Sequence, residues 1–236
     1  ALMNCIVVDD EPLARDGMED LITAHGELSL SGCFNNALKA SEFLRNNEID
    51  LIFLDIEMPG ITGLEFARHI PKETLVIFIT AYKEYAFDSY MLDAIDYLLK
   101  PVFPQQFEKA VDKAIQFHGL LKEPRPEIDR ITKDYILVKS ERKYHKISLD
   151  RIQYIEGLKD YVILHLPSER VIAPMNLKTI HEKLPKDRFF RISKSYIVNE
   201  IAIESFDTQN VYLKDLHLPI GKVYLDDFFR KFLGRP

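Results

Sequence analysis

The sequence predicts two consecutive domains of different fold class: an α/β doubly wound domain with a five-stranded parallel sheet, and then a mainly-β domain. The first half alternates short apolar runs with amphipathic helical stretches, whereas the second contains many short strand-like runs separated by turn residues. The charge changes at the same point. Residues 1–122 contain 10 Lys and Arg against 20 Asp and Glu, a net of −10, and residues 123–236 contain 21 against 17, a net of +4.

Five apolar runs in the first half are expected to form its strands. They are continuously apolar rather than alternating, which is typical of a parallel sheet with both faces covered. The expected strands are Asn4–Val8, Leu28–Phe34, Leu51–Leu54, Leu75–Thr80 and Ala94–Leu99. The clearest helical pattern follows the last strand, where apolar residues recur at three- and four-residue spacing: Phe107, Ala110, Val111, Ala114 and Ile115.

Two prolines among charged residues then interrupt the periodicity, and we expect a linker over residues 122–128 between domains at 3–121 and 129–236. Glu156-Gly157 and Pro167-Ser168 are expected to be turns. No helix-turn-helix pattern is present. Two helices are expected, Leu177–Leu184 and Val223–Leu233, among the strands Tyr135–Lys139, Tyr144–Ser148, Ile152–Glu156, Tyr161–Leu166, Arg170–Ala173, Tyr196–Asn199, Ile201–Phe206, Val211–Leu213 and Leu216–Ile220.

Several classes of protein are disfavoured by the composition. No apolar run approaches about 18 residues, so no membrane span is expected, and we expect no signal peptide. No clustered His and Cys pattern predicts a zinc site. The basic second half is compatible with a polyanionic partner, although many domains without one carry a similar charge.

Polar residues stand where the strands of the predicted parallel sheet end. Asp9-Asp10-Glu11 ends the first strand, Asp55 the third, Thr80 the fourth and Lys100-Pro101 the fifth. Ligands of doubly wound sheets collect at this edge. Converging carboxylates repel one another unless a cation lies among them, and Mg²⁺ prefers such oxygen ligands.

Thr80 adds a hydroxyl to this site, and Lys100 adds a positive charge. A metal ion, a cation, a hydroxyl and a carboxylate nucleophile together favour a site for phosphoryl transfer. In isolation each of these features has an ordinary explanation, since a strand-end Asp is often a helix cap or a solvated turn residue. Their joint occurrence favours the functional interpretation.

Three segments carry a resemblance to the receiver domain of two-component response regulators: Val7–Pro12 (VVDDEP), Phe53–Gly60 (FLDIEMPG) and Tyr97–Pro101 (YLLKP). The resemblance covers residues 3–121 and implies a flavodoxin-like fold. It implies that Asp55 accepts a phosphoryl group from a histidine kinase and that the protein works in the bacterial cytoplasm.

The resemblance also assigns roles to the neighbouring residues. Mg²⁺ would be bound directly by Asp10 and Asp55, through water by Asp9, and by the backbone carbonyl of Glu57. Thr80 and Lys100 would contact the phosphoryl oxygens, and the Lys100–Pro101 peptide would be cis. Tyr97 would be a switch aromatic that turns inward as Thr80 moves. Tyr97 could alternatively be an ordinary core residue.

The second half resembles the LytTR DNA-binding domain over residues 129–234, most clearly in Phe189–Asn199 (FFRISKSYIVN), Ile201–Ser205 and Leu218–Lys222. In that family, strands form the scaffold and loops enter successive major grooves. Two positions depart from the family, which usually has His at Ser193 and Ser-Arg at Gly221-Lys222. The second departure puts base preference in doubt, because Lys lacks the bidentate fork of Arg.

The resemblance indicates a small set of residues for DNA contact, namely Lys159, Tyr161, Lys194 and Lys222. Arg191 could either touch DNA or be a structural ion-pair partner, and Asn199 is expected to satisfy a turn backbone.

The implied function is a regulator of transcription rather than an enzyme. Phosphorylation of Asp55 would change the surface around residues 83–115, promote a homodimer and raise affinity for repeated sites in double-stranded DNA. One rival is a Mg²⁺-dependent phosphatase of the haloacid dehalogenase type, for which Glu57 gives faint support. Another makes the second domain a protein- or RNA-binding module.

Overall fold

The computed structural model describes residues 2–82, 94–122 and 126–234. It divides into two compact units, one that includes the described residues up to 120 and one from residue 121 onward. The last helix of the first unit ends at Lys122, and the first strand of the second begins at Glu127. Both elements therefore extend into the predicted linker.

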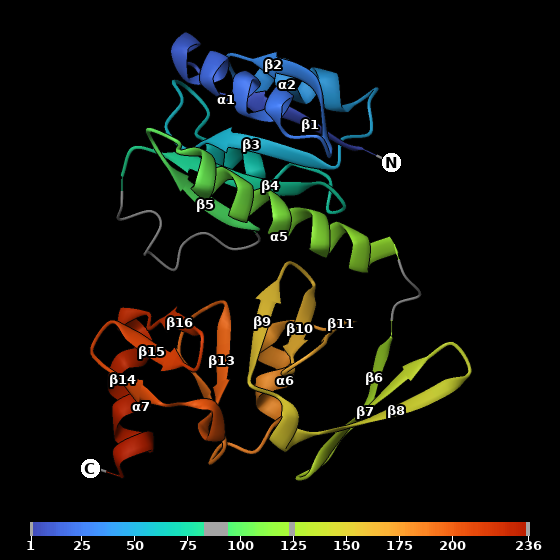
Figure 1. Ribbon diagram of the computed structural model, residues 1–236, viewed down its shortest axis with the longest axis vertical. Helices are drawn as coiled ribbons and strands as arrows, with labels where there is room; N and C mark the ends of the chain where they lie inside the picture. Colours follow the sequence, from blue (N-terminus) through green and yellow to red (C-terminus); the bar gives the residue numbers. More distant parts are fainter. Residues whose placement is uncertain (1, 83–93, 123–125, 235–236) are drawn as a thin grey trace. The chain divides into compact units, whose positions relative to one another are not determined.

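The first unit is a parallel sheet of five strands with the order β2-β1-β3-β4-β5 (Figure 1). This order and the parallel pairing confirm the doubly wound α/β prediction. The strands are β1 (Met3–Val8), β2 (Leu28–Phe34), β3 (Leu51–Asp55), β4 (Leu75–Thr80) and β5 (Asp96–Leu99), and the helices are α1 (Pro12–Ala24), α2 (Ala37–Leu44), α3 (Gly63–Ala67) and α5 (Pro104–Lys122). The last strand starts two residues later than predicted.

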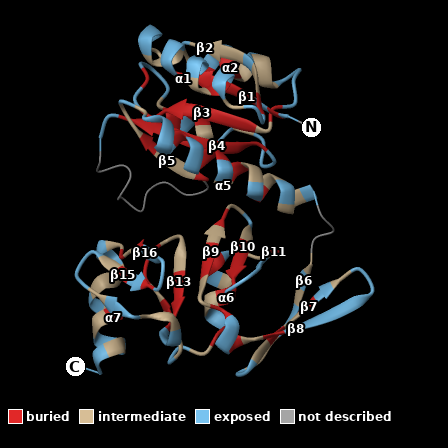
Figure 2. Ribbon diagram, viewed as in Figure 1, coloured by how far each residue is buried: buried red, intermediate tan, exposed pale blue. Residues whose placement is uncertain are grey.

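Burial on both faces explains the continuous apolar runs of the central strands. Every residue of β3 and β4 is buried, and both strands are red along their length in Figure 2. Helix α5 covers part of this sheet, where the rings of Phe53 and Phe107 stack with centroids 5.4 Å apart. Helix α3 starts with a capping box between Thr62 and Glu65, which fixes the loop that follows β3.

The second unit is mainly β, as predicted. Its sheets have the orders β11-β10-β9-β13-β12, β14-β15-β16 and β6-β7-β8. Its strands are β6 (Glu127–Ile131), β7 (Tyr135–Ser140), β8 (Lys143–Ser148), β9 (Tyr154–Leu158), β10 (Tyr161–His165), β11 (Arg170–Pro174), β12 (Phe189–Arg191), β13 (Tyr196–Asn199), β14 (Ser205–Phe206), β15 (Asn210–Leu213) and β16 (Leu216–Pro219). The helices are α6 (Leu177–Lys183) and α7 (Lys222–Leu233), with 3₁₀ turns at Leu149–Arg151 and Glu200–Ala202.

The prediction of a turn at Glu156-Gly157 was wrong, because both residues lie inside β9. Gly157 instead allows α6 to pack closely against β9, because a Cβ atom at this position would lie 2.8 Å from Cβ of Leu177 on α6. The turn lies at Lys159-Asp160, where Lys159 has a φ of 54°.

Three further differences concern the second unit. The predicted strand at Ile201 begins with a 3₁₀ turn, and only Ser205–Phe206 is extended. Strands β6 and β12 were not predicted. The first, Glu127–Ile131, is short, rich in charged residues and bulged against β7, so it lacks a clear alternating pattern.

None of the helices among the described residues combines the length and the apolar character needed to cross a membrane.

Candidate functional site

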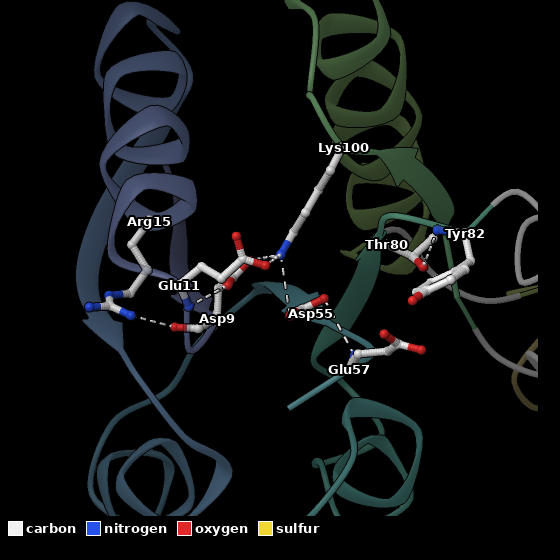
Figure 3. A network of polar contacts seen from close by, with 8 residues as sticks. All are labelled: Asp9, Glu11, Arg15, Asp55, Glu57, Thr80, Tyr82 and Lys100. Atoms are coloured by element: carbon white, nitrogen blue, oxygen red, sulfur yellow. Dashed lines mark hydrogen bonds and ion pairs between the residues drawn. The ribbon is translucent and has the colours of Figure 1, made fainter. Parts of the chain in front are cut away.

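The first wall of the site is the loop between β1 and α1. Asp9 is fully buried, and its Oδ1 accepts a hydrogen bond from the backbone N–H of Glu11 at 2.9 Å. The guanidinium of Arg15 donates to the backbone carbonyl of Asp9 at 2.6 Å, which holds the loop against the first turn of α1 (Figure 3). The carboxylate of Asp9 is thereby fixed at the carboxyl end of the sheet.

Asp55 ends β3 beside this loop and is also buried. Lys100 Nζ lies among the carboxylates, 2.9 Å from Asp9 Oδ2, 3.3 Å from Asp55 Oδ2 and 3.2 Å from Glu11 Oε1 (Figure 3). The Lys100–Pro101 peptide is cis, as the resemblance implied. The structure therefore brings three of the predicted residues, Asp9, Asp55 and Lys100, into direct contact.

The crowding of acidic groups changes the proton affinity of the site. Burial, and then the negative charge of Asp9, raises the pKa of Asp55 to about 6 although Lys100 opposes the shift. Burial alone would lower the pKa of Lys100, but its hydrogen bond to Asp9 and the charge of Asp55 outweigh burial and raise it. Lys100 is therefore a permanent cation, and Asp55 is largely ionised at neutral pH.

Three carboxylates converge closely enough to share one cation. Oxygen atoms of Asp9, Glu11 and Asp55 lie within 4.8 Å of one another. The predicted ligand Asp10 is half-buried at the end of β1, and its carboxylate is outside this group. Glu57 has an exposed side chain, and its backbone N–H donates to Asp55 Oδ1 at 3.4 Å.

Thr80 and Tyr97 occupy neighbouring strands. Thr80 is fully buried at the end of β4, and its hydroxyl accepts a hydrogen bond from the backbone N–H of Tyr82 at 3.1 Å. Tyr97 is half-buried on β5, and its ring stacks on Phe78 with centroids 5.7 Å apart. In the expected output surface, residues 83–115, positions 83–93 lie outside the described residues.

Two residues of the site have no role in the sequence interpretation. Glu11 contacts Lys100 and contributes to the carboxylate group, and Arg15 holds the backbone of Asp9. Glu11 is signalled by its place in the acidic run at the end of the first strand. Arg15 carries no such signal, because a single Arg in the first turns of a helix is commonplace.

The predicted DNA contacts lie on three segments that hydrogen bonds hold together. The N–H of Gly157 donates to the carbonyl of Ser195 at 2.8 Å, and that of Gly221 donates to the carbonyl of Ile192 at 2.8 Å. These bonds tie the β9–β10 hairpin to the β12–β13 loop, and that loop to the start of α7. The β9–β10 hairpin carries Lys159 and Tyr161, the β12–β13 loop carries Lys194, and α7 begins with Lys222. Lys222 is exposed, and the other three residues are half-buried.

Arg191 serves the loop itself. Its Nε donates to the carbonyl of Ser193 at 3.1 Å, and its Nη2 donates to that of Lys194 at 3.2 Å. The guanidinium also lies over the ring of Tyr224, 5.5 Å from the centroid. Its described partners are therefore carbonyls and a ring rather than the carboxylate of an ion pair.

Asn199 satisfies backbone groups, as predicted. It is fully buried, and its Nδ2 donates to the carbonyls of Leu149 and Ile152 at 2.9 and 2.7 Å. It thus fixes the 3₁₀ turn that precedes β9.

Comparisons with known proteins agree with both halves of this description. The family model of the response regulator receiver domain matches residues 5–112, and that of the LytTr DNA-binding domain matches residues 142–233. The transcriptional regulatory protein YpdB of Escherichia coli K12 is 31% identical over 239 residues, covering 96% of this chain and 98% of the relative. This chain belongs to the LytTR response regulators.

Other relatives carry related names. The sensory transduction protein LytT of Oceanobacillus iheyensis is 30% identical over 246 residues, covering 98% of both chains. Among solved structures, the response regulatory domain of mrkE from Klebsiella pneumoniae is 33% identical, covers 50% of this chain and 98% of its own, and has a TM-score of 0.46. A LytTR response regulator joins a receiver to a DNA-binding domain and is not a classical enzyme, which removes the phosphatase alternative.

The raised pKa of Asp55 predicts that the ionised carboxylate of this residue destabilises the native state. The pKa of about 6 lies above the value in the unfolded chain, so the native state binds this proton more tightly than the unfolded state does. The resulting stabilisation is complete below about pH 4 and is lost as the pH rises through about 6. In the absence of divalent metal, Asp55→Asn should raise the free energy of unfolding at about pH 7.5 by about 1–3 kcal/mol. Urea unfolding at about pH 4.5 should show a much smaller gain, and a gain independent of pH would contradict this assignment.

Proposed function

We propose that Asp55 accepts a phosphoryl group from a histidine kinase and that its phosphorylation controls DNA binding by the LytTR domain. The observation that carries this proposal is the buried contact of Lys100 with both Asp9 and Asp55 at the carboxyl end of the sheet. In this contact Asp55 is a desolvated nucleophile, and Lys100 supplies a fixed positive charge next to the phosphorylated product. We place the boundary between the two domains within residues 122–128.

The donor set of this site fits Mg²⁺. Lys100 supplies one positive charge to three converging carboxylates, and the remaining negative charge suits a hard divalent cation. We propose that Asp55 and the backbone carbonyl of Glu57 would bind it directly and Asp9 through water. The Asp10 carboxylate, which lies outside the converging group, would turn toward the ion and bind it directly. Bound there, the ion would neutralise charge on the oxygen atoms of the transferring group.

The chemistry falls to residues of this chain. A carboxylate oxygen of Asp55 attacks the phosphorus atom, a new O–P bond forms, and the P–N bond to the histidine of the kinase breaks with its electron pair on the imidazole nitrogen. Lys100 would then bond a phosphoryl oxygen in place of part of its contact with Asp55. The permanent charge of Lys100 stabilises both the reacting group and the acyl phosphate.

The switch would start at Thr80. Its hydroxyl accepts a backbone hydrogen bond from Tyr82, and as a donor the same hydroxyl can turn toward a phosphoryl oxygen on Asp55. Movement of this strand end would release space that Tyr97 fills. We propose that the resulting surface forms a homodimer in the bacterial cytoplasm. Two LytTR domains would then bind repeated sites in double-stranded DNA through Lys159, Tyr161, Lys194 and Lys222, with Arg191 shaping the loop.

Thr80 provides the test that separates phosphorylation from its consequence. With acetyl phosphate and Mg²⁺, Thr80→Ala should still gain one phosphoryl group at Asp55. Its dimer affinity should fall at least about tenfold, which is within the range of coupling found in typical switches. Thr80→Ser keeps the hydroxyl and is the matched control, so it should dimerise like the parent. Sedimentation and intact mass measured on the same samples report both steps. Equal dimerisation of the alanine variant and the parent would refute this role of Thr80.

The same samples discriminate the output partner. A LytTR domain should bind duplex DNA in preference to RNA of the same sequence, since its loops are proposed to enter the major groove. Stronger competition by RNA would favour the alternative of an RNA-binding module.

A further inference from the structure

The positive charge of the LytTR domain is concentrated in one hairpin. Strands β7 and β8, with the turn between them, cover Tyr135–Ser148 and contain four Lys and Arg against one acidic residue, Glu141. Residues 123–236 together have a net charge of only +4, so the net charge of +3 on this short hairpin is most of the total. None of the proposed DNA contacts lies in this hairpin, and the family model begins only at residue 142, near its turn.

Cations and tyrosines share the outward face of the hairpin. The buried residues Ile136, Val138 and Ile147 point to the core, and the alternate strand positions, which include Lys139, Tyr144 and Lys146, point away from it. Lys143 pairs with Ser140 next to the turn and lies on the same face as Ile147. Lys146 Nζ lies 4.4 Å from the ring centroid of Tyr135. Lys139 lies 5.9 Å from the ring of Tyr144, which is 56% exposed. The rings thus hold two ammonium groups on the solvent side of the sheet.

Several other cations of the same domain lie beside carboxylates. Arg151 contacts Glu169, Arg188 contacts Asp150, and Lys231 contacts Asp227. In the described part of the chain, no carboxylate lies within 4.0 Å of the charged groups of the four hairpin cations, which are Lys139, Arg142, Lys143 and Lys146. Figure 1 shows that the hairpin extends from the edge of its unit, away from α7, and Figure 2 shows its long exposed stretch.

We propose that the β7–β8 hairpin is a second DNA-contact surface, which binds backbone phosphates flanking the bases read by the three loops. The inference rests on the proposed DNA binding of the LytTR domain and extends its footprint. Duplex DNA is the partner with the matching charge, because its phosphates form a dense row of negative charge along which a line of cations can bind. Phosphate contacts of this kind add affinity and salt dependence without base preference.

The test is the salt dependence of binding by the full chain. The probe is a mixed-sequence duplex of roughly 30 base pairs, about three helical turns, and fluorescence anisotropy is measured between about 50 and 200 mM salt. In the hairpin variant, Lys139, Lys146 and the exposed turn residue Arg142 are all changed to Gln. Its slope of log affinity against log salt should be less steep than that of the parent by about 2–3, with a loss of about 10- to 100-fold in affinity near 0.1 M salt.

Two controls separate position from net charge and from folding. Changing three exposed lysines elsewhere in the same domain to Gln, at Lys178, Lys183 and Lys214, removes the same charge and should leave the slope within about 1 of the parent. A variant with Lys139→Arg and Lys146→Arg that retains Arg142 should keep the parental slope.

Each other outcome has a definite meaning. An unchanged slope in the hairpin variant would overturn the inference while leaving DNA binding by the loops intact. The inference would also fail if that variant altered self-association in sedimentation but not DNA binding, since the hairpin would then contact an acidic protein surface. Failure of the parent itself to bind duplex DNA would instead refute the proposed function.

Discussion

Gly63→Ala is expected to destabilise the receiver domain by about 3 kcal/mol and to abolish most phosphorylation. A Cβ atom at Gly63 would lie 2.0 Å from the backbone carbonyl oxygen of Asp55, and the same glycine donates its N–H to the carbonyl of Ile56 at 2.9 Å. The contact is with backbone, so it cannot be relieved by turning a side chain. Either the end of β3 moves, and with it the carboxylate of Asp55 that we propose as the acceptor, or the first turn of α3 unwinds.

Gly17→Ala is the matched control for this prediction. Gly17 lies inside α1, where a Cβ atom would meet nothing within 4 Å, so alanine should stabilise the protein by about 0.5–1 kcal/mol through helix propensity. Urea unfolding measures both variants, and intact mass after acetyl phosphate and Mg²⁺ treatment measures acceptor activity. Equal effects of the two substitutions would show that the close approach of Gly63 to Asp55 has no energetic consequence.

Lys100→Met is the second large expected effect. Methionine keeps much of the length of the side chain but leaves Asp9 and Asp55 buried without their shared cation. Removing one partner of a buried ion pair costs roughly 3–5 kcal/mol, and the partial exposure of Lys100 and Glu11 should place this case near the lower value. Loss of phosphorylation should accompany the loss of stability, because the positive charge that would stabilise the acyl phosphate is gone.

A double-mutant cycle shows whether this cost comes from the unpaired carboxylates. Adding Asp55→Asn to Lys100→Met removes one of the two repelling charges, so the destabilisation should fall substantially. Lys39→Met changes an exposed lysine on α2 and should alter stability by less than about 0.5 kcal/mol. Strictly additive effects of the two site substitutions would contradict the coupling described for Asp55 and Lys100.

The receiver fold, and the contact of Asp9, Asp55 and Lys100 at one edge of its sheet, were predictable from the sequence because the relevant signals are local. Continuous apolar runs predict strands buried on both faces, and the residues that end those strands must meet at one edge of a parallel sheet. Asp9, Asp55 and Lys100 therefore come into contact although they are far apart in the chain. The role of Arg15 is tertiary, since it depends on how the first turns of α1 lie against the backbone of Asp9.

The LytTR domain was predicted less completely because its signals depend on neighbours. Gly157 resembles a turn residue in sequence, yet it lies within β9 because Leu177 of α6 approaches the strand closely. Strand β6 has charged residues on an edge, where alternation is weak. Backbone hydrogen bonds between distant segments bring together the β9–β10 hairpin, the β12–β13 loop and the start of α7. No local sequence pattern predicts such bonds.

Phosphorylation of Asp55 is the central claim, and intact mass spectrometry of the full chain tests it most directly. After incubation with acetyl phosphate and Mg²⁺, the parent should gain the mass of a single phosphoryl group, peptide mapping should place it on Asp55, and chelation of the metal should prevent the gain. Asp55→Asn, treated identically, should gain none. Equal labelling of Asp55→Asn, or no labelling of the parent in the presence of Mg²⁺, would contradict the account.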